Sequence, residues 1–217
     1  MARSDPTNRP RPTTRRGALT WLGASALPRW AHAQSDGTRP RYTVSVVPQF
    51  AASELHRDWA PLLERLSQES RLSLTLRVVE TISRFEAEFL AGVPDFVYLN
   101  PYHQVMARRA QGYVPLVRDG KPLSGILVVR RDSALRSVTE LAGKPVAFPS
   151  PNAFGASLWI RALLAERDRV TIEPHYAQTH SNVYRQVLLG RVAAGGGVNN
   201  TLLQEREEVR TELRVLM

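Results

Sequence analysis

The sequence predicts an α/β protein made of two similar lobes, and three observations predict it. Strand-like runs rich in β-branched residues alternate with helical runs along most of the chain. After Asp132 the order of elements begins again. Within that order, Thr81-Ile82-Ser83 and Gly92 recur 98 positions later as Thr179-His180-Ser181 and Gly190. A matched block of Thr-x-Ser, helix and glycine indicates related halves with a cleft between them.

Composition limits the possible classes. The chain has 217 residues, of which 43% are hydrophobic, so it can bury a core. The net charge is +9, but the first 33 residues hold six Arg and one Asp, which leaves +4 for the rest. The high basicity is therefore partly a property of the N-terminus and does not indicate a nucleic-acid partner. The chain has no cysteine, which excludes disulfides, zinc–thiolate sites and cysteine nucleophiles.

The N-terminus reads as an export signal. Residues 1–33 contain the pair Arg15 and Arg16, an apolar run over 18–27, and an A-x-A cleavage site at 31–33. The run is too short to span a bilayer. The arginine pair is similar to a twin-arginine signal, although Ala18 stands where that motif prefers Phe, and general secretory export stays open. Residues 34–41 are a polar lead-in.

The first half, residues 42–130, is predicted as lobe 1. Helix starts are assigned to Ser53, Ser83 and Asn100–Pro101, and helix ends to Gly92 and Gly112. The expected strands are 42–50, 72–80, 94–100, 113–120 and 123–131, and the expected helices are 53–66, 83–91 and 101–111.

The second half, residues 131–217, is predicted as lobe 2. Ser137 and Glu140 have the spacing of a capping box. The expected strands are 145–150, 170–177, 191–198 and 213–217, and the expected helices are 137–144, 154–166, 181–189 and 199–212. Trp59 and Trp159 lie on apolar helical faces and are predicted as core.

The predicted site lies at the strand ends. In open α/β sheets a ligand sits outside the carboxyl ends of the strands, where helix N-termini present free N–H groups and partial positive charge. Such a site suits an anion without a lysine. The candidate ligand-binding residues collected at these ends are Gln49, Tyr98, Asn100, Tyr102, Ser150, Asn152, Ala153, Phe154, His180 and Asn199. Each also has an ordinary structural reading, as a helix cap, a turn residue or a core aromatic ring.

Other site chemistries find no support in the sequence. The run Gly195-Gly196-Gly197 matches neither phosphate-binding glycine pattern. The five histidines are scattered, so no metal constellation is predicted, and no nucleophile, base and acid form a catalytic trio. We therefore expect no metal, no cofactor and no catalysis.

Three stretches carry a family resemblance. They are Gly-x-x-Asp-x-x-Tyr-Leu-x-Pro from Gly92 to Pro101, Ser-x-x-Glu-Leu-x-Gly-Lys-x-Val-Ala-Phe from Ser137 to Phe148, and His180 with Gly190. From about Tyr42 to the end, the chain resembles the phosphate/phosphite/phosphonate substrate-binding proteins of ABC transporters. The resemblance implies the type II periplasmic-binding fold, with mixed sheets flanked by helices and two lobes that close on a ligand. It also implies that Tyr98 and His180 line the cleft and that the loop after Phe148 binds the anion's oxygens.

The sequence departs from that family in two places. Ala153-Phe154-Gly155 stand where the family has hydroxyl side chains, so a dianionic phosphonate is less favoured and a partly apolar ligand more so. The family's chain also returns from the second lobe to complete the first. That return segment is expected to be missing here, which would leave apolar surface exposed on the first lobe.

The resemblance implies a periplasmic, monomeric receptor that binds a small anion and delivers it to an ABC permease in the inner membrane, with no nucleic-acid partner. A ligand-sensing module that feeds a membrane kinase is the alternative. An enzyme related to a pyrimidine-forming enzyme of thiamine synthesis is a weaker one, because the chain has no cysteine and no evident cofactor site.

Overall fold

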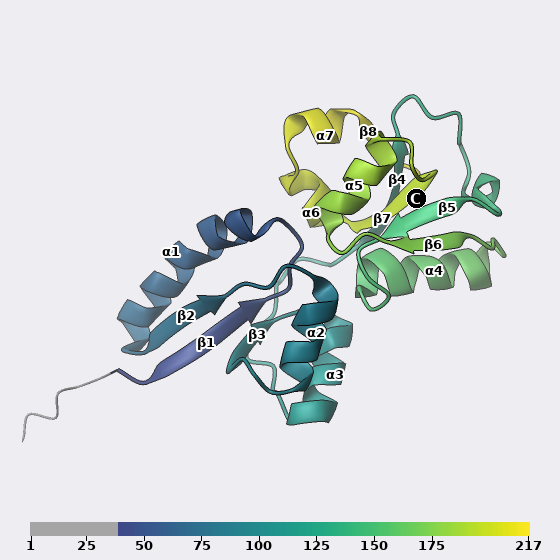
Figure 1. The fold of residues 1–217 in the computed structure, drawn as a ribbon. Coiled ribbons are helices and arrows are strands. Elements are labelled where there is room, and N and C mark those ends of the chain that lie inside the picture. Colours follow the sequence, from purple (N-terminus) through teal and green to yellow (C-terminus); the bar gives the residue numbers. More distant parts are fainter. Residues whose placement is uncertain (1–38) are drawn as a thin grey trace, which may run out of the picture. The chain divides into compact units, whose positions relative to one another are not determined.

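In a computed structural model the described residues, 39–217, form two α/β lobes, each built on its own sheet (Figure 1). The predicted export signal and most of the polar lead-in lie outside the described residues. The two-lobe fold expected from the repeated order of elements is confirmed.

The first lobe has three parallel strands in the order β2-β1-β3. Helix α1 lies on one side of this sheet and α2 with α3 on the other (Figure 1). The elements are β1 (Arg41–Val46), α1 (Ala52–Ser70), β2 (Ser73–Arg77), α2 (Ile82–Leu90), β3 (Phe96–Tyr98) and α3 (Pro101–Gln111).

The second lobe has five strands in the order β6-β5-β7-β4-β8, with β4 antiparallel to both of its neighbours. Its strands are β4 (Gly125–Arg130), β5 (Pro145–Phe148), β6 (Glu173–Tyr176), β7 (Ala194–Val198) and β8 (Leu213–Val215). Its helices are η1 (Val138–Leu141), the run of η2 (Phe154–Trp159), α4 (Ile160–Ala162) and η3 (Leu163–Arg167), then α5 (His180–Leu188), α6 (Asn199–Gln204) and α7 (Glu207–Thr211).

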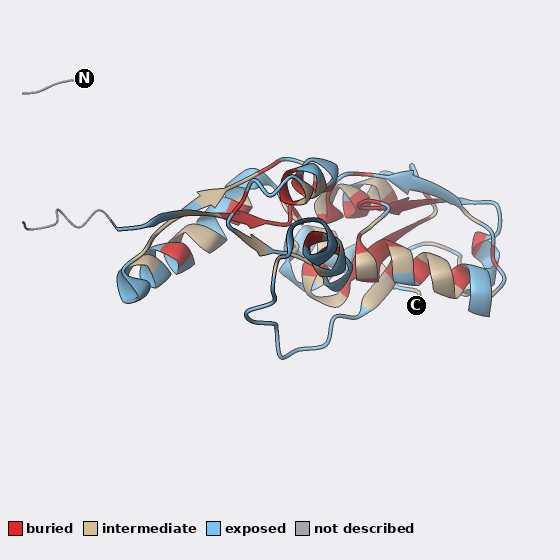
Figure 2. Ribbon diagram, turned by 90° about the horizontal axis from the view of Figure 1, so that it is seen from below, coloured by how far each residue is buried: buried red, intermediate tan, exposed pale blue. Residues whose placement is uncertain are grey.

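Alternation along the strands of the second sheet supplies a core on both faces. Leu127 and Val129 of β4 pack with the helical run 154–167, whereas Val128 between them packs with α5. Phe148 and Ala147 of β5 divide in the same way. This follows from the period of two in a strand, and Figure 2 shows the buried residues concentrated in these strands and in the helix faces against them.

The glycines of β7 allow helices to approach both faces of the sheet. A Cβ at Gly196 would lie 2.1 Å from the Ala156 carbonyl oxygen, and one at Gly197 would lie 2.2 Å from the Tyr184 hydroxyl. Only glycine permits this spacing. The triple glycine is therefore a packing device.

The sequence placed several boundaries incorrectly. The predicted border between the lobes at residue 130 moves to the connection 112–124, because β4 pairs with β7 and β8 of the second sheet. The strand predicted over 113–120 is absent, and the Val117 side chain there is 91% exposed. A strand needs a neighbour for its backbone groups, and no described strand pairs with this segment.

Helix starts and one core residue also differ from prediction. The N-caps of α1 and α2 are Ala51 and Thr81, not the predicted Ser53 and Ser83. The single helix predicted over 199–212 is α6 and α7, separated where Glu205 is extended and accepts a hydrogen bond from the Ser181 hydroxyl at 2.6 Å. Trp159, predicted as core, is 50% exposed.

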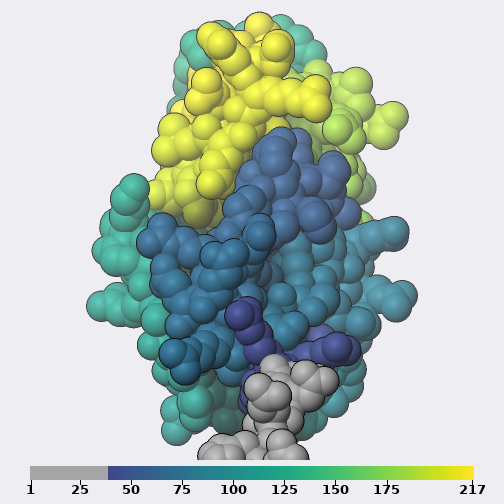
Figure 3. Space-filling view, turned by 90° about the vertical axis from the view of Figure 1, so that its left-hand side faces the viewer, coloured from purple at the N-terminus to yellow at the C-terminus, as the bar shows by residue number. Residues whose placement is uncertain are grey.

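Other local predictions are confirmed. Ser137 and Glu140 form the capping box of η1. Asn100 caps α3 with Pro101 in its first turn, and Gly112 ends that helix at a φ of 75°. Large apolar side chains are exposed on the first lobe, among them Leu62 and Leu66 of α1, which lies on the side of the molecule seen in Figure 3. The last strand, β8, pairs with β4 in the second sheet.

Candidate functional site

The start of α3 is held by Asn100. The side-chain Oδ1 of Asn100 accepts a hydrogen bond from the backbone N–H of His103 at 2.9 Å, which is the usual N-cap bond. This bond fixes the amide orientation, so that Nδ2 faces away from the helix backbone. The Nδ2 group lies 3.1 Å from Nδ1 of the His103 ring and 3.4 Å from the backbone oxygen of Asn152.

Asn152 joins the second lobe to the first. It lies in the turn between β5 and η2, and its backbone oxygen accepts from Asn100. Its side-chain Nδ2 donates to Oε2 of Glu86 on α2 at 3.2 Å. Two residues that the sequence predicted for the site, one on each lobe, are therefore brought together.

Glu86 and His103 complete this contact, and the sequence analysis missed both as site residues. Oε1 of Glu86 lies 2.9 Å from Nε2 of His103. The His103 ring is fully buried, with the Phe85 and Phe89 rings 6.0 and 5.5 Å away between centroids. The signal available in the sequence was a glutamate four residues after Ile82, on the same side of the helix as that buried side chain.

A second contact between the lobes uses backbone groups. The backbone N–H of His180, at the first position of α5, donates to the backbone oxygen of Gln49 at 3.1 Å. Gln49 and His180 were both predicted for the site on the basis of their side chains. In the structure it is their main-chain atoms that meet.

The His180 side chain is turned into the second lobe. Its Nδ1 lies 3.2 Å from the hydroxyl of Thr201, which also lies 2.8 Å from the Tyr184 hydroxyl. Burial lowers the pKa of His180 to about 3, so the ring is neutral at physiological pH. A neutral, buried ring carries no positive charge that could attract an anion. The His180 side chain is therefore not an electrostatic source of anion affinity.

The turn after β5 is anchored through its backbone and contains an unpaired hydroxyl. The backbone oxygen of Pro149 accepts from Gln178 N–H at 2.9 Å, which fixes the turn against the start of α5. Ser150 is 2% exposed, and its Oγ has no hydrogen-bond partner among residues 39–217. Ser157, on the following helix, was not predicted for the site. Its Oγ is also buried and has no hydrogen-bond partner among residues 39–217. A buried hydroxyl normally has a partner, so these two can donate to a guest or to water.

The remaining predicted residues have varied surroundings. The Tyr98 ring is 43% exposed and stacks on Trp59 with the centroids 4.8 Å apart. Asn199, at the start of α6, accepts from Ser124 N–H at 3.3 Å and donates its own N–H to the Ser124 oxygen at 2.9 Å. The rest of the predicted set lies in or beside the first turns of helices, with Ala153 buried, Phe154 half-buried and Tyr102 exposed.

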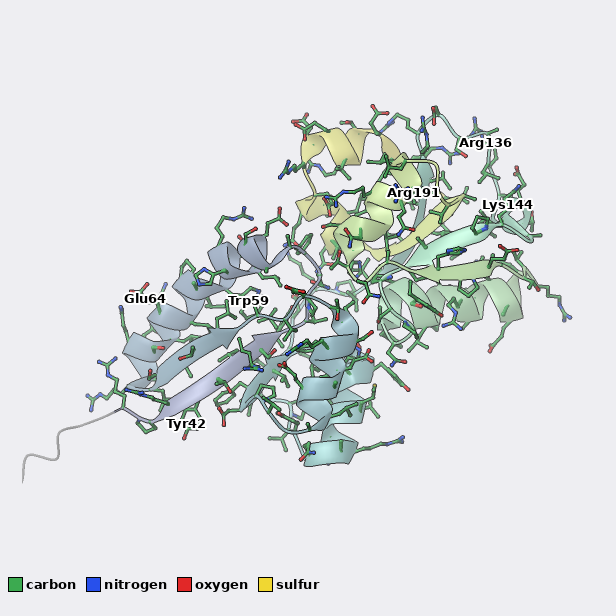
Figure 4. All side chains as sticks on the ribbon, viewed as in Figure 1. Tyr42, Trp59, Glu64, Arg136, Lys144 and Arg191 are labelled. Atoms are coloured by element: carbon green, nitrogen blue, oxygen red, sulfur yellow. The ribbon has the colours of Figure 1, made fainter. Side chains whose placement is uncertain are left out.

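Two pockets lie away from these contacts. One, of about 350 Å³, is lined by Arg130, Asp132 and Lys144, the last of which is labelled in Figure 4. The other, of about 360 Å³, is lined by Arg77, Arg84 and Glu88. In the first pocket Arg130 forms an ion pair with Asp132. In the second, Arg77 and Arg84 both form ion pairs with Glu88. We therefore place the candidate site at the contact between the lobes and not in these pockets.

Metal chemistry and membrane insertion find no support in residues 39–217. No group of three or more His, Asp or Glu side chains within that range is arranged to hold a metal ion. None of the helices described there is both long and apolar enough to cross a membrane.

Comparison with known proteins places the fold. Solved structures with the same fold include a binding protein component of a phosphonate ABC transporter from Pseudomonas aeruginosa, with a TM-score of 0.71 and 12% identity over 82% of this chain. The chain spans 65% of that protein's length, less than two thirds. A second is PhnD1 from Prochlorococcus marinus in complex with methylphosphonate, with a TM-score of 0.73 and 15% sequence identity. The match covers 82% of this chain and 71% of PhnD1.

A third solved structure is the periplasmic VFT2 domain of BvgS from Bordetella pertussis. It gives a TM-score of 0.56 and 21% identity, over 82% of this chain and 75% of its own. At these identities each likeness shows the fold alone. No curated protein sequence matches the chain.

The family itself is shown by sequence. The model of the family described as "ABC transporter, phosphonate, periplasmic substrate-binding protein" matches residues 44–217. This range includes both lobes and every residue predicted for the site. The chain therefore belongs to the family of periplasmic substrate-binding proteins of phosphonate ABC transporters.

Proposed function

We propose that this protein is the receptor of an ABC importer and binds a small anion, of the phosphonate, phosphite or phosphate class, between its two lobes. The observation that carries the proposal is the contact of Asn152 with Asn100 and Glu86. It brings the rims of the two lobes together at the strand ends, where an α/β fold binds its ligand. Family membership and the fold support the same reading.

The chemistry of the turn after β5 suits an anion. The helical run 154–167 begins just after that turn, and the first N–H groups of a helix are free and carry a partial positive charge. The unpaired hydroxyl of Ser150 is an additional donor at that place. Hydrogen bonds to charged groups contribute about 1.5–3 kcal/mol each, so a few such donors are sufficient for binding without a lysine.

The candidate binding residues keep different roles in this proposal. Ser150 and Asn152, with the backbone at Ala153 and Phe154, contact the anion from the second lobe. Tyr98, Asn100, Tyr102 and Gln49 close over it from the first lobe, and His180 and Asn199 hold the start of α5 and of α6 in position. Phe154 replaces a hydroxyl donor with an apolar ring, which favours a ligand with an apolar substituent over inorganic phosphate.

Location and partners follow from the same proposal. The protein acts in the periplasm as a monomer after residues 1–33 are cleaved, and it hands its cargo to a permease in the inner membrane. It performs no catalysis, because the residues at the lobe contact bind and position but include no activated nucleophile. No cofactor and no nucleic acid take part.

Thermal denaturation in the presence of candidate ligands tests the proposal. Millimolar methylphosphonate, phosphite or phosphate should raise the melting temperature, because a ligand that binds only the folded state stabilises it. Ser150→Ala should weaken the apparent affinity by about tenfold or more. Ser133→Ala, in the same lobe but away from the site, should retain the shift. If none of these anions raises the melting temperature of the wild-type protein, the proposal is wrong.

A ligand-sensing module is the second candidate, and the likeness to the VFT2 domain of BvgS favours it. Both functions require the same binding step, so thermal shifts do not separate them. Reconstitution does: a receptor stimulates ATP hydrolysis by its cognate permease in proteoliposomes when the ligand is present. A ligand-bound protein that stimulates no permease encoded beside it would favour the sensing function.

A further inference from the structure

Four residues form a closed ring of hydrogen bonds across the two lobes, made by their side chains and by the backbone oxygen of Asn152. Asn100 donates from Nδ2 to Nδ1 of His103 and to the backbone oxygen of Asn152. Both paths then end on Glu86, whose two carboxylate oxygens lie 2.9 Å from Nε2 of His103 and 3.2 Å from Nδ2 of Asn152. Glu86 is the acceptor on which the ring closes.

The ring fixes the tautomer of His103. Because Oδ1 of Asn100 is used by the helix N-terminus, the nearby Nδ2 can only donate, and Nδ1 of His103 must accept. The ring proton then lies on Nε2 and is donated to Glu86. The carboxylate thus receives a hydrogen bond from a neutral ring and a second from a neutral amide.

Within residues 39–217, no lysine or arginine pairs with Glu86. Its side chain is 15% exposed, and within residues 39–217 its only ion-pair contact is with His103. The nearest arginine in sequence, Arg84, pairs with Glu88 at 3.4 Å instead. A mostly buried carboxylate is thus held by donors alone, beside the loop proposed to receive an anion.

We propose that Glu86 is the resident anion of the site between the lobes. Its carboxylate holds the Asn152 amide, and an anionic guest must displace it to gain that donor. This inference rests on the proposed function, since it assigns to the same site a competitor that the chain itself supplies.

Two consequences follow from this arrangement. The contact between Glu86 and Asn152 keeps the lobes together when no ligand is present. It also raises the threshold for binding, since a guest anion bonded to Asn152 would stand within a few ångströms of a like charge. Glu86 therefore sets specificity by excluding anions that bind too weakly to displace it.

Glu86→Gln is the informative variant. Glutamine has nearly the same shape, but an NH2 group replaces one of the two oxygens that separately face His103 and Asn152. One of these donors therefore loses its acceptor, and the charge is removed. The matched control is Glu88→Gln. It makes the same change of charge two residues along α2, but the hydrogen bonds of Glu88 are with Arg77 and Arg84 and stay within the first lobe.

A distance measurement tests the first consequence. Because the chain has no cysteine, spin labels can be attached to single cysteines introduced at Glu64 on α1, labelled in Figure 4, and at Glu166 on the exposed side of η3. In ligand-free protein, Glu86→Gln should broaden and lengthen the distribution of distances between the labels, and Glu88→Gln should not. An unchanged distribution in Glu86→Gln would overturn the proposal. If that variant does not fold, Asn152→Ala, which removes the partner amide, should give the same broadening.

Calorimetric titration with methylphosphonate tests the second consequence. Glu86→Gln should bind it about tenfold more tightly than wild type, because a competing charge has been removed, while Glu88→Gln should bind as wild type does. Unchanged or weaker binding in Glu86→Gln overturns the competition, and weaker binding would make Glu86 a guest contact. If no variant binds any anion, the proposed function fails, and the distance measurement alone still decides whether Glu86 holds the lobes.

Discussion

Helices α2 and α5 occupy equivalent places in the two lobes, offset by 98 residues, and they share their end geometry. Each has nine residues and starts at a threonine whose hydroxyl oxygen accepts from a backbone N–H at 3.2 Å. Each is followed by a glycine with positive φ, 72° at Gly92 and 66° at Gly190. The duplication therefore extends to single hydrogen bonds.

Both helices are tied to the helix that follows the next strand by a network containing a histidine. In the first lobe Glu86 of α2 bonds to His103 of α3. In the second lobe Tyr184 of α5 bonds to Thr201 of α6, and Thr201 in turn bonds to His180. Glu86 and Tyr184 are the same position of the repeat.

The difference lies in what each network faces. The second is closed within its lobe, and burial raises the pKa of Tyr184 while it lowers that of His180 to about 3, so both groups stay neutral. The first network ends on a carboxylate that reaches Asn152 of the other lobe. One side chain at an equivalent position thus decides whether the network stabilises a lobe or joins two lobes.

Placing a glutamate, the first lobe's residue at this position of the repeat, in the second lobe should have the largest effect on stability. Tyr184→Glu would bury a carboxyl group in the apolar core cluster of β4 and α5. We expect the free energy of unfolding to fall by about 4 kcal/mol or more at pH 7. Burial raises the pKa of such a carboxyl in the folded state, so stability should partly recover as the pH is lowered. Urea denaturation at several pH values measures this.

Glu86→Gln is the counterpart at the equivalent position. It leaves one donor of the first network without an acceptor, but at a site that is partly exposed, so we expect a loss of about 1–2 kcal/mol. If Tyr184→Glu and Glu86→Gln lower the free energy of unfolding equally, the view that only the second network is closed within its lobe is wrong.

Thr201→Val should rank between these two variants. The hydroxyl of this fully buried residue contacts both Tyr184 and His180, and valine has the same shape without it. Two buried polar groups then lose a partner, which should lower the free energy of unfolding by about 2–4 kcal/mol. Thr171→Val, at an exposed position, is the control and should change stability by less than about 0.5 kcal/mol. If the two variants are equally stable, Thr201 does not hold the network together.

The pH dependence of stability tests the burial of His180. Its pKa falls from 6.5 to about 3 in the folded protein, so below pH 6.5 the unfolded chain takes up a proton that the folded protein does not. Stability from this residue is complete above pH 6.5 and decreases by about 1.4 kcal/mol per pH unit between 6.5 and 3. Chemical denaturation of wild type and His180→Gln from pH 7 to 4 should show the variant with the shallower slope. The exposed His56→Gln should follow the wild type, and parallel curves for His180→Gln would exclude the prediction.

The same comparison explains how much of the fold the sequence could predict. Local signals determine caps, turns and strand alternation, so the repeat around Thr81 and Thr179 and the caps at Asn100 and Ser137 were visible. The strand predicted over 113–120 failed because alternation alone does not supply a neighbouring strand. The predicted helix over 199–212 failed because the Ser181–Glu205 contact, which no local signal announces, interrupts it.

The site was predicted in part for a similar reason. Asn100 and Asn152 could be placed at strand ends because the fold puts ligand groups there, and the structure brings them within hydrogen-bond distance. Glu86 and His103 are 17 residues apart, and Glu86 and Asn152 are 66 apart, so their contacts depend on tertiary packing. The role of His180 was predicted from its position, yet its ring turned inward because Thr201 offers it a partner.

The two threonine caps give the smallest effect and the sharpest test of equivalence. Thr81→Ala and Thr179→Ala each remove one bond from a side-chain oxygen to a helix N–H at 3.2 Å. Each should lower the free energy of unfolding by about 1 kcal/mol. Thr179→Ala has a further expected consequence, because the His180 N–H that meets Gln49 lies in the turn it caps. Urea denaturation should show equal losses of stability in the two variants, because the two helix starts share their geometry. Methylphosphonate titration should show weaker affinity in Thr179→Ala alone, because only that helix start contacts the other lobe through Gln49. A loss in one variant alone would show instead that the repeat is not energetically equivalent.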